Sequence, residues 1–369
     1  MRNASTVLVA AGLLVMGCKG SDSSSATPSS SASTTVAVAP KSDTVSLNGA
    51  GATFPFPLYS KWISEFGKAN PQVKVNYQSV GSGAGIKQIT DQTVDFGASD
   101  APMSDEELAK AKGKLHHVPM TLGAVVVTYN LPDAKAAIKL TPEALTGVFM
   151  GEIKKWNDPK LVADNPDAKL PATNITVVAR SDGSGTTAVF TDYLAKVSPA
   201  WKDKVGAGKS VKWPAGISSK GNEGVTGSVK STPGSIGYVE LAYAKQNNLA
   251  TASLKNQAGK FTDAALASVT AAAASVADKM PDDLRVSITN APGEAAYPIA
   301  AFSYVLVYEQ NANAQTGQAL ANYLWWGLHE GQEHAEALHY GKLPAPVVAK
   351  AEAKVKLLKA EGKALLVGK

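Results

Sequence analysis

Cysteine is the scarcest residue of this 369-residue chain, which contains one, Cys18. A single cysteine excludes an intramolecular disulfide and a cysteine-based zinc site. A basic stripe is also missing, because the 36 Lys and Arg are mixed with 31 Asp and Glu along the sequence. We therefore do not expect a nucleic-acid partner, since such proteins concentrate their positive charge. Beyond residue 18, no apolar run approaches the ~20 residues needed to span a bilayer.

The composition and length of the chain are those of a folded protein. Hydrophobic residues make up 44% of the chain and charged residues 18%, which excludes a wholly disordered chain. At ~150 residues per domain, the length suggests about two domains, with one large α/β domain as the alternative.

The N-terminal residues have the pattern of a secretion signal. Arg2 precedes an apolar stretch over 7–16 that is too short to cross a membrane. The stretch ends in Val-Met-Gly-Cys at 15–18, which resembles the bacterial lipobox, whose cysteine becomes lipidated. The sequence thus predicts a signal peptide over 1–17 and a lipidated Cys18, and an ordinary signal peptide with an incidental cysteine is the alternative.

A serine-rich segment follows the predicted lipidation site. Residues 21–35 contain eight serines and three threonines, a composition typical of a flexible tether. Together with a lipid anchor, a tether over 18–43 would hold a folded protein close to a membrane. We therefore expect a location in the periplasm or cell envelope, anchored to a membrane by lipid.

From residue 44 onward, short strand-like runs alternate with helical patterns. The expected strands lie at 44–47, 73–78, 94–98, 125–129, 175–179 and 302–308. The expected helices lie at 57–66, 86–90, 105–112, 186–194 and 315–326, with an amphipathic helix over 344–366. This alternation predicts an α/β protein with βαβ units and mainly parallel sheets flanked by helices.

Four loops rich in glycine and in hydroxyl side chains follow predicted strands, at 48–55, 81–85, 95–102 and 180–187. In open α/β sheets, ligands bind beyond the carboxyl ends of the strands. Three of these loops open helices, where free N–H groups and the helix dipole favour an anion. Arg180 adds a permanently charged donor. A turn with a helix N-cap explains any one loop, but several together predict a shared anion site.

Near-matches to catalytic and cofactor motifs each lack a required residue. The pattern beginning at Gly49 lacks the third glycine of a dinucleotide site, and 208–210 lacks the first glycine of a P-loop. The glycine that precedes a nucleophile elbow is missing before Ser184. His329 and His334 are five apart rather than four, so they do not match a zinc protease. We expect the five histidines at the surface or at helix ends, and no catalytic residue, metal site or cofactor.

Longer segments carry a family resemblance. They lie at 49–55, 86–89, 94–102, 147–157, 182–186, 211–214 and 237–248. In this order they resemble the periplasmic phosphate-binding protein, the substrate-binding component of bacterial phosphate ABC transporters. The similarity covers roughly residues 44–345, nearly the whole folded part.

The resemblance implies both a fold and a function. The fold is a two-lobed periplasmic-binding-protein fold, type II-like, with a mainly parallel sheet flanked by helices in each lobe and the ligand in the cleft between them. One lobe is expected over 44–123 plus 300–369, and the other over 124–299. The function is high-affinity binding of inorganic phosphate and its delivery to the membrane permease subunits of an ABC transporter, by a monomer that is not an enzyme.

The family's phosphate contacts map onto residues of the expected type in this chain. They are Thr53, Phe54 (through its backbone N–H), Ser82, Asp100, Arg180, Asp182, Ser184, Gly185 and Thr186. One departure is Gly83, where many relatives carry a second serine. Asp182 is expected to orient the Arg180 guanidinium, and an N-cap for the following helix is the alternative.

Asp100 carries the predicted selectivity. Near neutral pH phosphate has at least one P–OH, which an ionised carboxylate accepts, whereas sulfate has none. A buried acceptor left without a donor costs ~1–3 kcal/mol or more. Arsenate, a phosphate ester, a hydrolase that holds phosphate as product, and a sensory or adhesive lipoprotein remain as alternatives.

Overall fold

The structure is a computed structural model that describes residues 44–134 and 136–366. The predicted signal peptide, Cys18 and the predicted tether lie outside these residues. In the described part, no helix is long and apolar enough to cross a membrane.

One large sheet organises the described residues, in the strand order β2-β1-β3-β12-β4-β8-β6-β7, with β9 added to β4. Its strands are β1 (Val45–Gly51), β2 (Val73–Ser79), β3 (Phe96–Ser99), β4 (Leu115–Tyr129), β6 (Thr176–Arg180), β7 (Ile217–Ser219), β8 (Ser235–Glu240), β9 (Ala250–Thr251) and β12 (Ala300–Tyr308). The pairs at both ends of the sheet are parallel, as strand–helix alternation predicts. The central pairs, β3 with β12, β12 with β4 and β4 with β8, are antiparallel.

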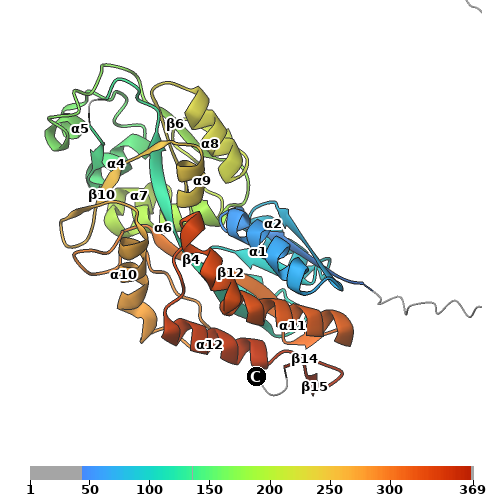
Figure 1. Cartoon of the computed structure of the whole chain (residues 1–369). Helices are drawn as coiled ribbons and strands as arrows, with labels where there is room; N and C mark the ends of the chain where they lie inside the picture. Colours follow the sequence, from blue (N-terminus) through green and yellow to red (C-terminus); the bar gives the residue numbers. More distant parts are fainter. Residues whose placement is uncertain (1–43, 135, 367–369) are drawn as a thin grey trace, which may run out of the picture. The chain divides into compact units, whose positions relative to one another are not determined.

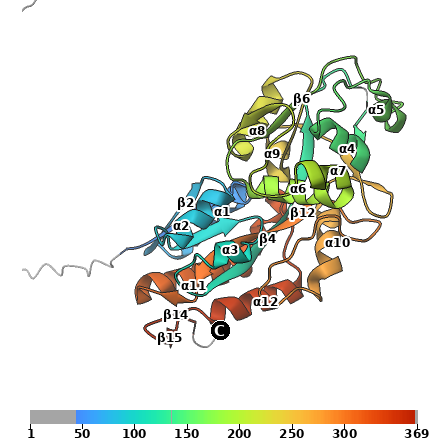
Figure 2. The same ribbon diagram turned by 180° about the vertical axis from the view of Figure 1, so that it is seen from behind.

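Strand β4 joins the two ends of the sheet. Its residues 115–124 pair with β12, whereas 125–129 pair with β8. All its side chains are buried, as expected for a central strand covered on both faces. In both ribbon views, α1, α2 and α11 gather around the β1–β3 end, and α4 to α9 gather around the β6–β8 end (Figures 1 and 2). Helix α12 packs against α11 and β4.

The helices are α1 (Phe56–Ala69), α2 (Ser82–Thr90), α3 (Asp105–Leu108), α4 (Pro142–Phe149), α5 (Pro159–Asp164), α6 (Gly185–Val197), α7 (Pro199–Lys204), α8 (Gly221–Ser231), α9 (Leu241–Gln246), α10 (Leu266–Ala277), α11 (Ala314–Leu328) and α12 (Ala345–Lys356). Two small sheets combine β5 (Lys139–Leu140), β10 (Ser253–Lys255) and β11 (Phe261–Thr262), and β13 (Gln310–Asn311), β14 (Lys359–Ala360) and β15 (Lys363–Ala364). Helices α1 and α12 begin within one residue of the predicted positions, and proline occupies the first turn of both, as it does in α4, α5 and α7.

The predicted C-terminal helix over 344–366 is wrong in its second half. Helix α12 ends at Lys356, and the chain then forms the hairpin β14–β15. Glu361 and Gly362 have φ of 51° and 76°, a conformation that a helix cannot continue and that glycine adopts readily. The hairpin attaches to β13 through β14, and β14 packs beside α11 (Figure 1).

Two other sequence expectations need correction. The predicted loop 48–55 begins inside β1, where a side chain at Gly49 would place its Cβ 2.1 Å from Phe96 Cζ, so this glycine serves close strand packing. His116 and His117 are buried in β4 rather than exposed. The backbone N–H of Met103 donates to His117 Nε2 at 3.0 Å, and burial lowers the pKa of His117 to about 3, so this imidazole is neutral.

Candidate functional site

The residues predicted to hold the ligand lie at strand ends and helix starts on neighbouring elements. Asp100 follows β3 directly, Arg180 ends β6, and Ser82 and Gly185 are the first residues of α2 and α6. The predicted residues that are buried are Thr53, Phe54, Ser82, Asp100, Arg180, Ser184, Gly185 and Thr186. Asp182 is half-buried. The fold therefore places polar side chains in the interior, where each needs a partner.

Asp100, Ser82 and Gly185 meet at one point. The Asp100 backbone N–H donates to Ser82 Oγ at 3.3 Å, and Ser82 Oγ lies 3.4 Å from Asp100 Oδ2. A Cβ on Gly185 would lie 2.3 Å from Ser82 Oγ and 2.4 Å from Asp100 Oδ2. The start of α6 thus packs tightly against residues that the sequence assigns to the other lobe.

Burial changes the acid strength of Asp100. Desolvation raises its pKa from the ordinary range of an aspartate to about 7, although Ser303, the positive charge of Arg180 and Ser82 oppose the shift. Ser303, on β12, donates from Oγ to Asp100 Oδ1 at 2.8 Å. Without a bound anion, Asp100 therefore changes its protonation state near neutral pH. Nothing in the sequence pattern singled out Ser303, because it lies inside a strand far from any glycine-rich loop.

Arg180 and Asp182 form a two-point ion pair. Arg180 Nε donates to Asp182 Oδ1 at 2.8 Å and Nη2 donates to Oδ2 at 2.6 Å. Burial raises the pKa of Asp182, but the Arg180 guanidinium outweighs it and holds that pKa below its ordinary value. The geometry agrees with the predicted orienting role of Asp182. The alternative role as an N-cap is wrong, because Ser184 caps α6 by accepting from Thr187 N–H at 3.0 Å.

The guanidinium of Arg180 is only partly hydrogen-bonded within the described residues. Its side chain is almost wholly buried, and within the described residues Nη1 has no hydrogen-bond partner. A buried guanidinium donor without an acceptor is unfavourable, so this atom marks a place where an oxyanion fits.

Thr53 and Thr186 are joined by a residue that sequence reasoning missed. Asn222 Nδ2 donates to Thr53 Oγ1 at 2.6 Å and to Thr186 Oγ1 at 3.1 Å. Asn222 is the second residue of α8, and the Gly221 N–H before it donates to Asp182 Oδ1 at 3.0 Å. A local signal was available, because the Gly-Asn pair opens α8 shortly after the short strand β7, as in the other loops.

The backbone around Phe54 is held from both sides. Tyr243 Oη donates to the Thr53 carbonyl at 2.6 Å, and Tyr340 Oη donates to the Phe54 carbonyl at 2.6 Å. The Phe54 ring lies in the core, so the backbone N–H is the group that this residue offers to a ligand. Tyr243 was also missed, since a lone tyrosine on a short helix gives no pattern.

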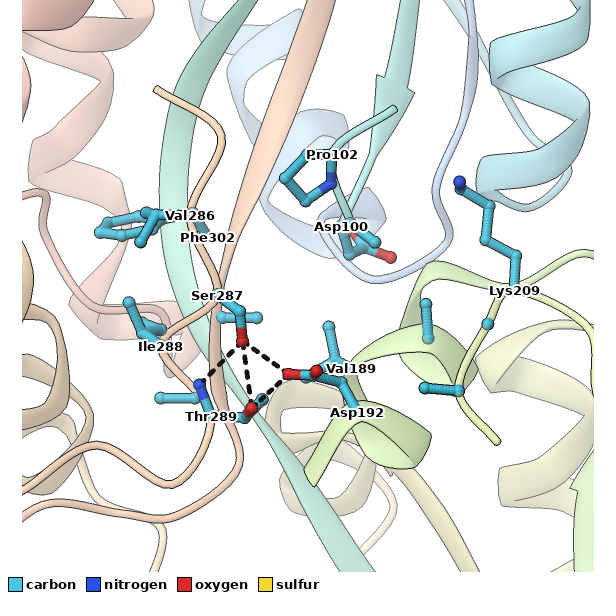
Figure 3. A pocket seen from close by; sticks show the side chains of 16 residues that line it. Asp100, Pro102, Val189, Asp192, Lys209, Val286, Ser287, Ile288, Thr289 and Phe302 are labelled. Carbon is cyan, nitrogen blue, oxygen red and sulfur yellow. Dashed lines mark hydrogen bonds between the residues drawn. The ribbon is translucent and has the colours of Figure 1, made fainter. Parts of the chain in front are cut away.

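A cavity of about 270 Å³ borders this cluster at Asp100 (Figure 3). Asp192 on α6 accepts hydrogen bonds from Ser287 Oγ, at 2.6 Å, and from Thr289 Oγ1 on one wall of the cavity. Lys209 stands on the opposite side (Figure 3). These bonds fix the segment around Ser287 to α6 beside the predicted site.

The chemistry of the cluster suits an oxyanion rather than a cation or a reaction. Helix starts, hydroxyl groups and Arg180 supply hydrogen-bond donors, and Asp100 supplies a carboxylate. Among the described residues, no group of three or more His, Cys, Asp or Glu could hold a metal ion. Such an arrangement can bind a small anion through many local dipoles and one cation.

Comparisons with known proteins place the chain in a family. A family model described as a PBP superfamily domain matches residues 29–325. The phosphate-binding protein PstS of Xylella fastidiosa (strain 9a5c) is 43% identical over 342 residues, which are 92% of this chain and 93% of that protein. PstS of Haemophilus influenzae is 47% identical, covering 85% of this chain and 94% of its own length. A solved phosphate-binding protein from Stenotrophomonas maltophilia has a TM-score of 0.66 at 20% identity, covering 84% of this chain and 93% of its own.

The class defined by the fold is that of the periplasmic binding proteins, and this confirms the fold predicted from the sequence. Within that superfamily, the chain belongs to the family of the phosphate-binding proteins PstS. Members of this family are substrate-binding proteins, so the chain is not an enzyme.

Proposed function

We propose that this chain binds inorganic phosphate reversibly outside the cytoplasm and delivers it to the membrane permease subunits of an ABC transporter. The observation that carries the proposal is the buried Arg180 guanidinium, whose Nη1 lacks a partner within the described chain. It is held by Asp182 near the hydroxyl groups and Asp100. The names of the PstS relatives point to phosphate as the anion that would complete this bonding.

The proposed contacts are those implied by the family resemblance. Phosphate oxygens are held by Thr53, Phe54 N–H, Ser82, Asp100, Arg180, Asp182, Ser184, Gly185 and Thr186. The burial of eight of these residues and the half-burial of Asp182 support the proposal. A site that closes around its ligand removes water and strengthens charge-assisted hydrogen bonds.

Asp100 discriminates phosphate from sulfate in this proposal. The ionised carboxylate accepts a hydrogen bond from the P–OH of phosphate, whereas sulfate turns a bare oxygen toward it. The fully buried position of Asp100 supports the proposal, because an unpaired charge is most unfavourable where water cannot reach it.

The two-lobed division accounts for reversible binding. We assign residues 44–123 and 300–369 to one lobe and 124–299 to the other, which close on phosphate and reopen on the permease. The change of partner along β4, from β12 to β8 between Ala124 and Val125, supports this boundary. The chain acts as a monomer in this proposal.

Calorimetric titration of residues 44–369, stripped of anion by unfolding and refolding, tests the function. Tight one-to-one binding of phosphate without a sulfate signal supports both the function and the role of Asp100. Equal binding of both anions keeps an anion site but contradicts the selectivity mechanism. Absence of binding by folded protein contradicts the proposed function, and tighter binding of arsenate or of a phosphate ester would replace phosphate as the ligand.

The variant Asp100→Asn isolates the selectivity mechanism. The amide donates as well as accepts, so a sulfate oxygen gains a partner that the carboxylate cannot give. We expect sulfate affinity to rise and phosphate affinity to fall, each about 10-fold or more. A variant that rejects sulfate as strongly as the wild type does would show that another residue carries the discrimination.

We also propose that Cys18, in the N-terminal segment, carries a lipid that anchors the protein to a membrane. Because two signals are usually needed for stable attachment by acyl chains, a multiply acylated cysteine would retain the protein firmly. Replacement Cys18→Ser should move the protein from the membrane fraction to the soluble fraction. Unchanged membrane retention of the variant would contradict the anchor.

A further inference from the structure

Asn222 connects two elements of the proposed site from a fully buried position. Its Nδ2 group lies between Thr53, in the loop after β1, and Thr186, in the first turn of α6. The sequence assigns these two threonines to different lobes. Asn222 therefore lies where the two halves of the site meet.

The orientation of the Asn222 amide is fixed by a backbone group. Oδ1 accepts from the Glu240 N–H at 2.9 Å. A peptide N–H can only donate, so the oxygen must face Glu240 and the NH₂ group must face the threonines. Both hydrogens of Nδ2 are then directed to Thr53 and Thr186, and the amide has no freedom to flip.

These bonds determine what the threonine hydroxyls can still do. Thr53 Oγ1 accepts from Asn222 Nδ2 at 2.6 Å and from the Asn222 backbone N–H at 3.2 Å. A hydroxyl oxygen has two lone pairs, so Thr53 is left with its O–H as a donor. Thr186 gives one lone pair to Asn222, which turns its O–H away from Nδ2.

We propose that Asn222 is a positioning residue that presents the hydroxyls of Thr53 and Thr186 as hydrogen-bond donors to the bound anion. This inference rests on the proposed function. A tetrahedral oxyanion at the site then directs unprotonated oxygens to the two threonines and its P–OH to Asp100. Asn222 also ties the two threonines into the closed arrangement, because one NH₂ group reaches both only when their elements are together.

A double-mutant cycle on the full-length chain tests the proposal. Phosphate dissociation constants are measured calorimetrically for the wild type, Asn222→Ala, the Thr53→Val/Thr186→Val pair and the triple variant. We expect Asn222→Ala to weaken binding about 10- to 100-fold in the wild type. In the valine background, where no hydroxyl is left to orient, the same change should alter affinity by about twofold or less.

Asn165→Ala is the matched control for loss of a buried amide. Asn165 is buried and hydrogen-bonds to the backbone of Lys139 and Leu161, which are not part of the site. We expect it to lower the unfolding temperature and to leave phosphate affinity unchanged. This result separates the positioning role from general stability.

Asn222→Asp provides a second readout, because a carboxylate attracts the threonine O–H groups away from the anion. We expect it to weaken binding more than Asn222→Ala does, and we expect this excess to shrink to about twofold or less in the valine background. An excess that persists there reflects charge repulsion and contradicts the proposal, as does an Asn222→Ala effect that is additive with the valines. Failure of the wild type to bind phosphate would instead overturn the proposed function, and this inference with it.

Discussion

At the scale of single residues, Asp100 combines a buried carboxyl with a pKa of about 7. In the unfolded chain this group ionises near pH 4, so between pH 4 and 7 the folded protein keeps a proton that the unfolded chain has lost. The unfolded state therefore binds fewer protons, and this contribution to stability decreases as pH rises through that window.

The pH dependence of unfolding should reflect this sign. Without phosphate, the wild type should lose roughly 2–3 kcal/mol of unfolding free energy relative to Asp100→Asn between pH 5 and pH 8, because the ionised carboxylate of Asp100 is buried away from water in the folded state. Urea unfolding at both pH values measures the difference. Ser303→Ala removes a hydrogen bond that lowers this pKa, so it should move the transition to higher pH. Equal pH dependence in wild type and Asp100→Asn would contradict the raised pKa.

Gly185 is a second residue whose role follows from distances. Its missing side chain leaves room for Ser82 Oγ and Asp100 Oδ2, which would lie 2.3 and 2.4 Å from a Cβ. Gly185→Ala should therefore weaken phosphate binding about 100-fold or more, because the elements cannot approach fully. Calorimetry measures the affinity, and thermal unfolding checks that the variant is folded.

Gly227→Ala serves as the control for this substitution. Gly227 lies in α8, where a Cβ meets nothing within 4 Å. Since alanine favours helix over glycine by about 1 kcal/mol, this variant should be slightly more stable and should bind phosphate normally. Normal binding by Gly185→Ala as well would mean that the contact with Asp100 is not needed for the bound state.

At the scale of elements, the C-terminal hairpin anchors the chain end to α11. Leu365 is buried and lies close to Gly317 of that helix. Leu365→Ala should lower the free energy of unfolding by about 2–3 kcal/mol and leave phosphate affinity unchanged, because the hairpin is outside the site. Denaturant unfolding measures the loss. The exposed control Lys363→Ala should change stability little, and an equal effect of both variants would contradict the packing of Leu365.

Helices and strands were predictable from the sequence where local patterns, rather than long-range contacts, determine them. The alternation of strands and helices correctly predicted the parallel βαβ units at both ends of the sheet, because helices there cover both faces. The hairpin after α12 was missed, because an Ala- and Lys-rich pattern favours a helix until a tertiary pairing with β13 competes with it. The antiparallel centre was also missed, since β4 meets β12 across about 180 residues of chain.

The residues of the candidate site also fall into two groups, those that local sequence patterns reveal and those that they do not. Glycine-rich strand-to-helix loops are local, so Ser82, Arg180 and Gly185 follow from sequence. Tyr243 and Ser303 act through contacts with residues more than 150 positions away, which no local pattern contains. The local Gly-Asn signal likewise does not reveal that Asn222 contacts Thr53. The neutral, buried His117 was missed for a different reason, because the strand predicted over 125–129 begins ten residues later than β4, which contains it.

At the scale of the whole molecule, an ion pair links the two assigned lobes beside the site. Lys209 Nζ contacts Glu107 Oε2 on α3 at 2.8 Å, and both side chains are partly buried. The Lys209 carbonyl accepts from Ser184 N–H at 2.8 Å, so the lysine is attached to the start of α6. The ion pair therefore connects the proposed anion site of one lobe to the other lobe.

The ion pair between Lys209 and Glu107 should slow release of the ligand. Because the pair joins the two assigned lobes, which separate in the proposed release, Lys209→Met should raise the phosphate dissociation rate about two- to fivefold, as expected for a partly exposed ion pair of ~0.5–1 kcal/mol. Stopped-flow displacement measures the rate. The effect should shrink in 1 M salt, which screens the charges.

Reversal of both charges distinguishes the pair from a general effect of surface charge. Lys209→Glu should speed release, and Glu107→Lys added to it should restore much of the original rate, since attraction returns with the signs exchanged. Lys87→Met is the matched control, because its partner Asp91 lies on the same side of the closure, at the end of α2. A similar change of rate in this control would mean that net charge, rather than the contact between lobes, governs release.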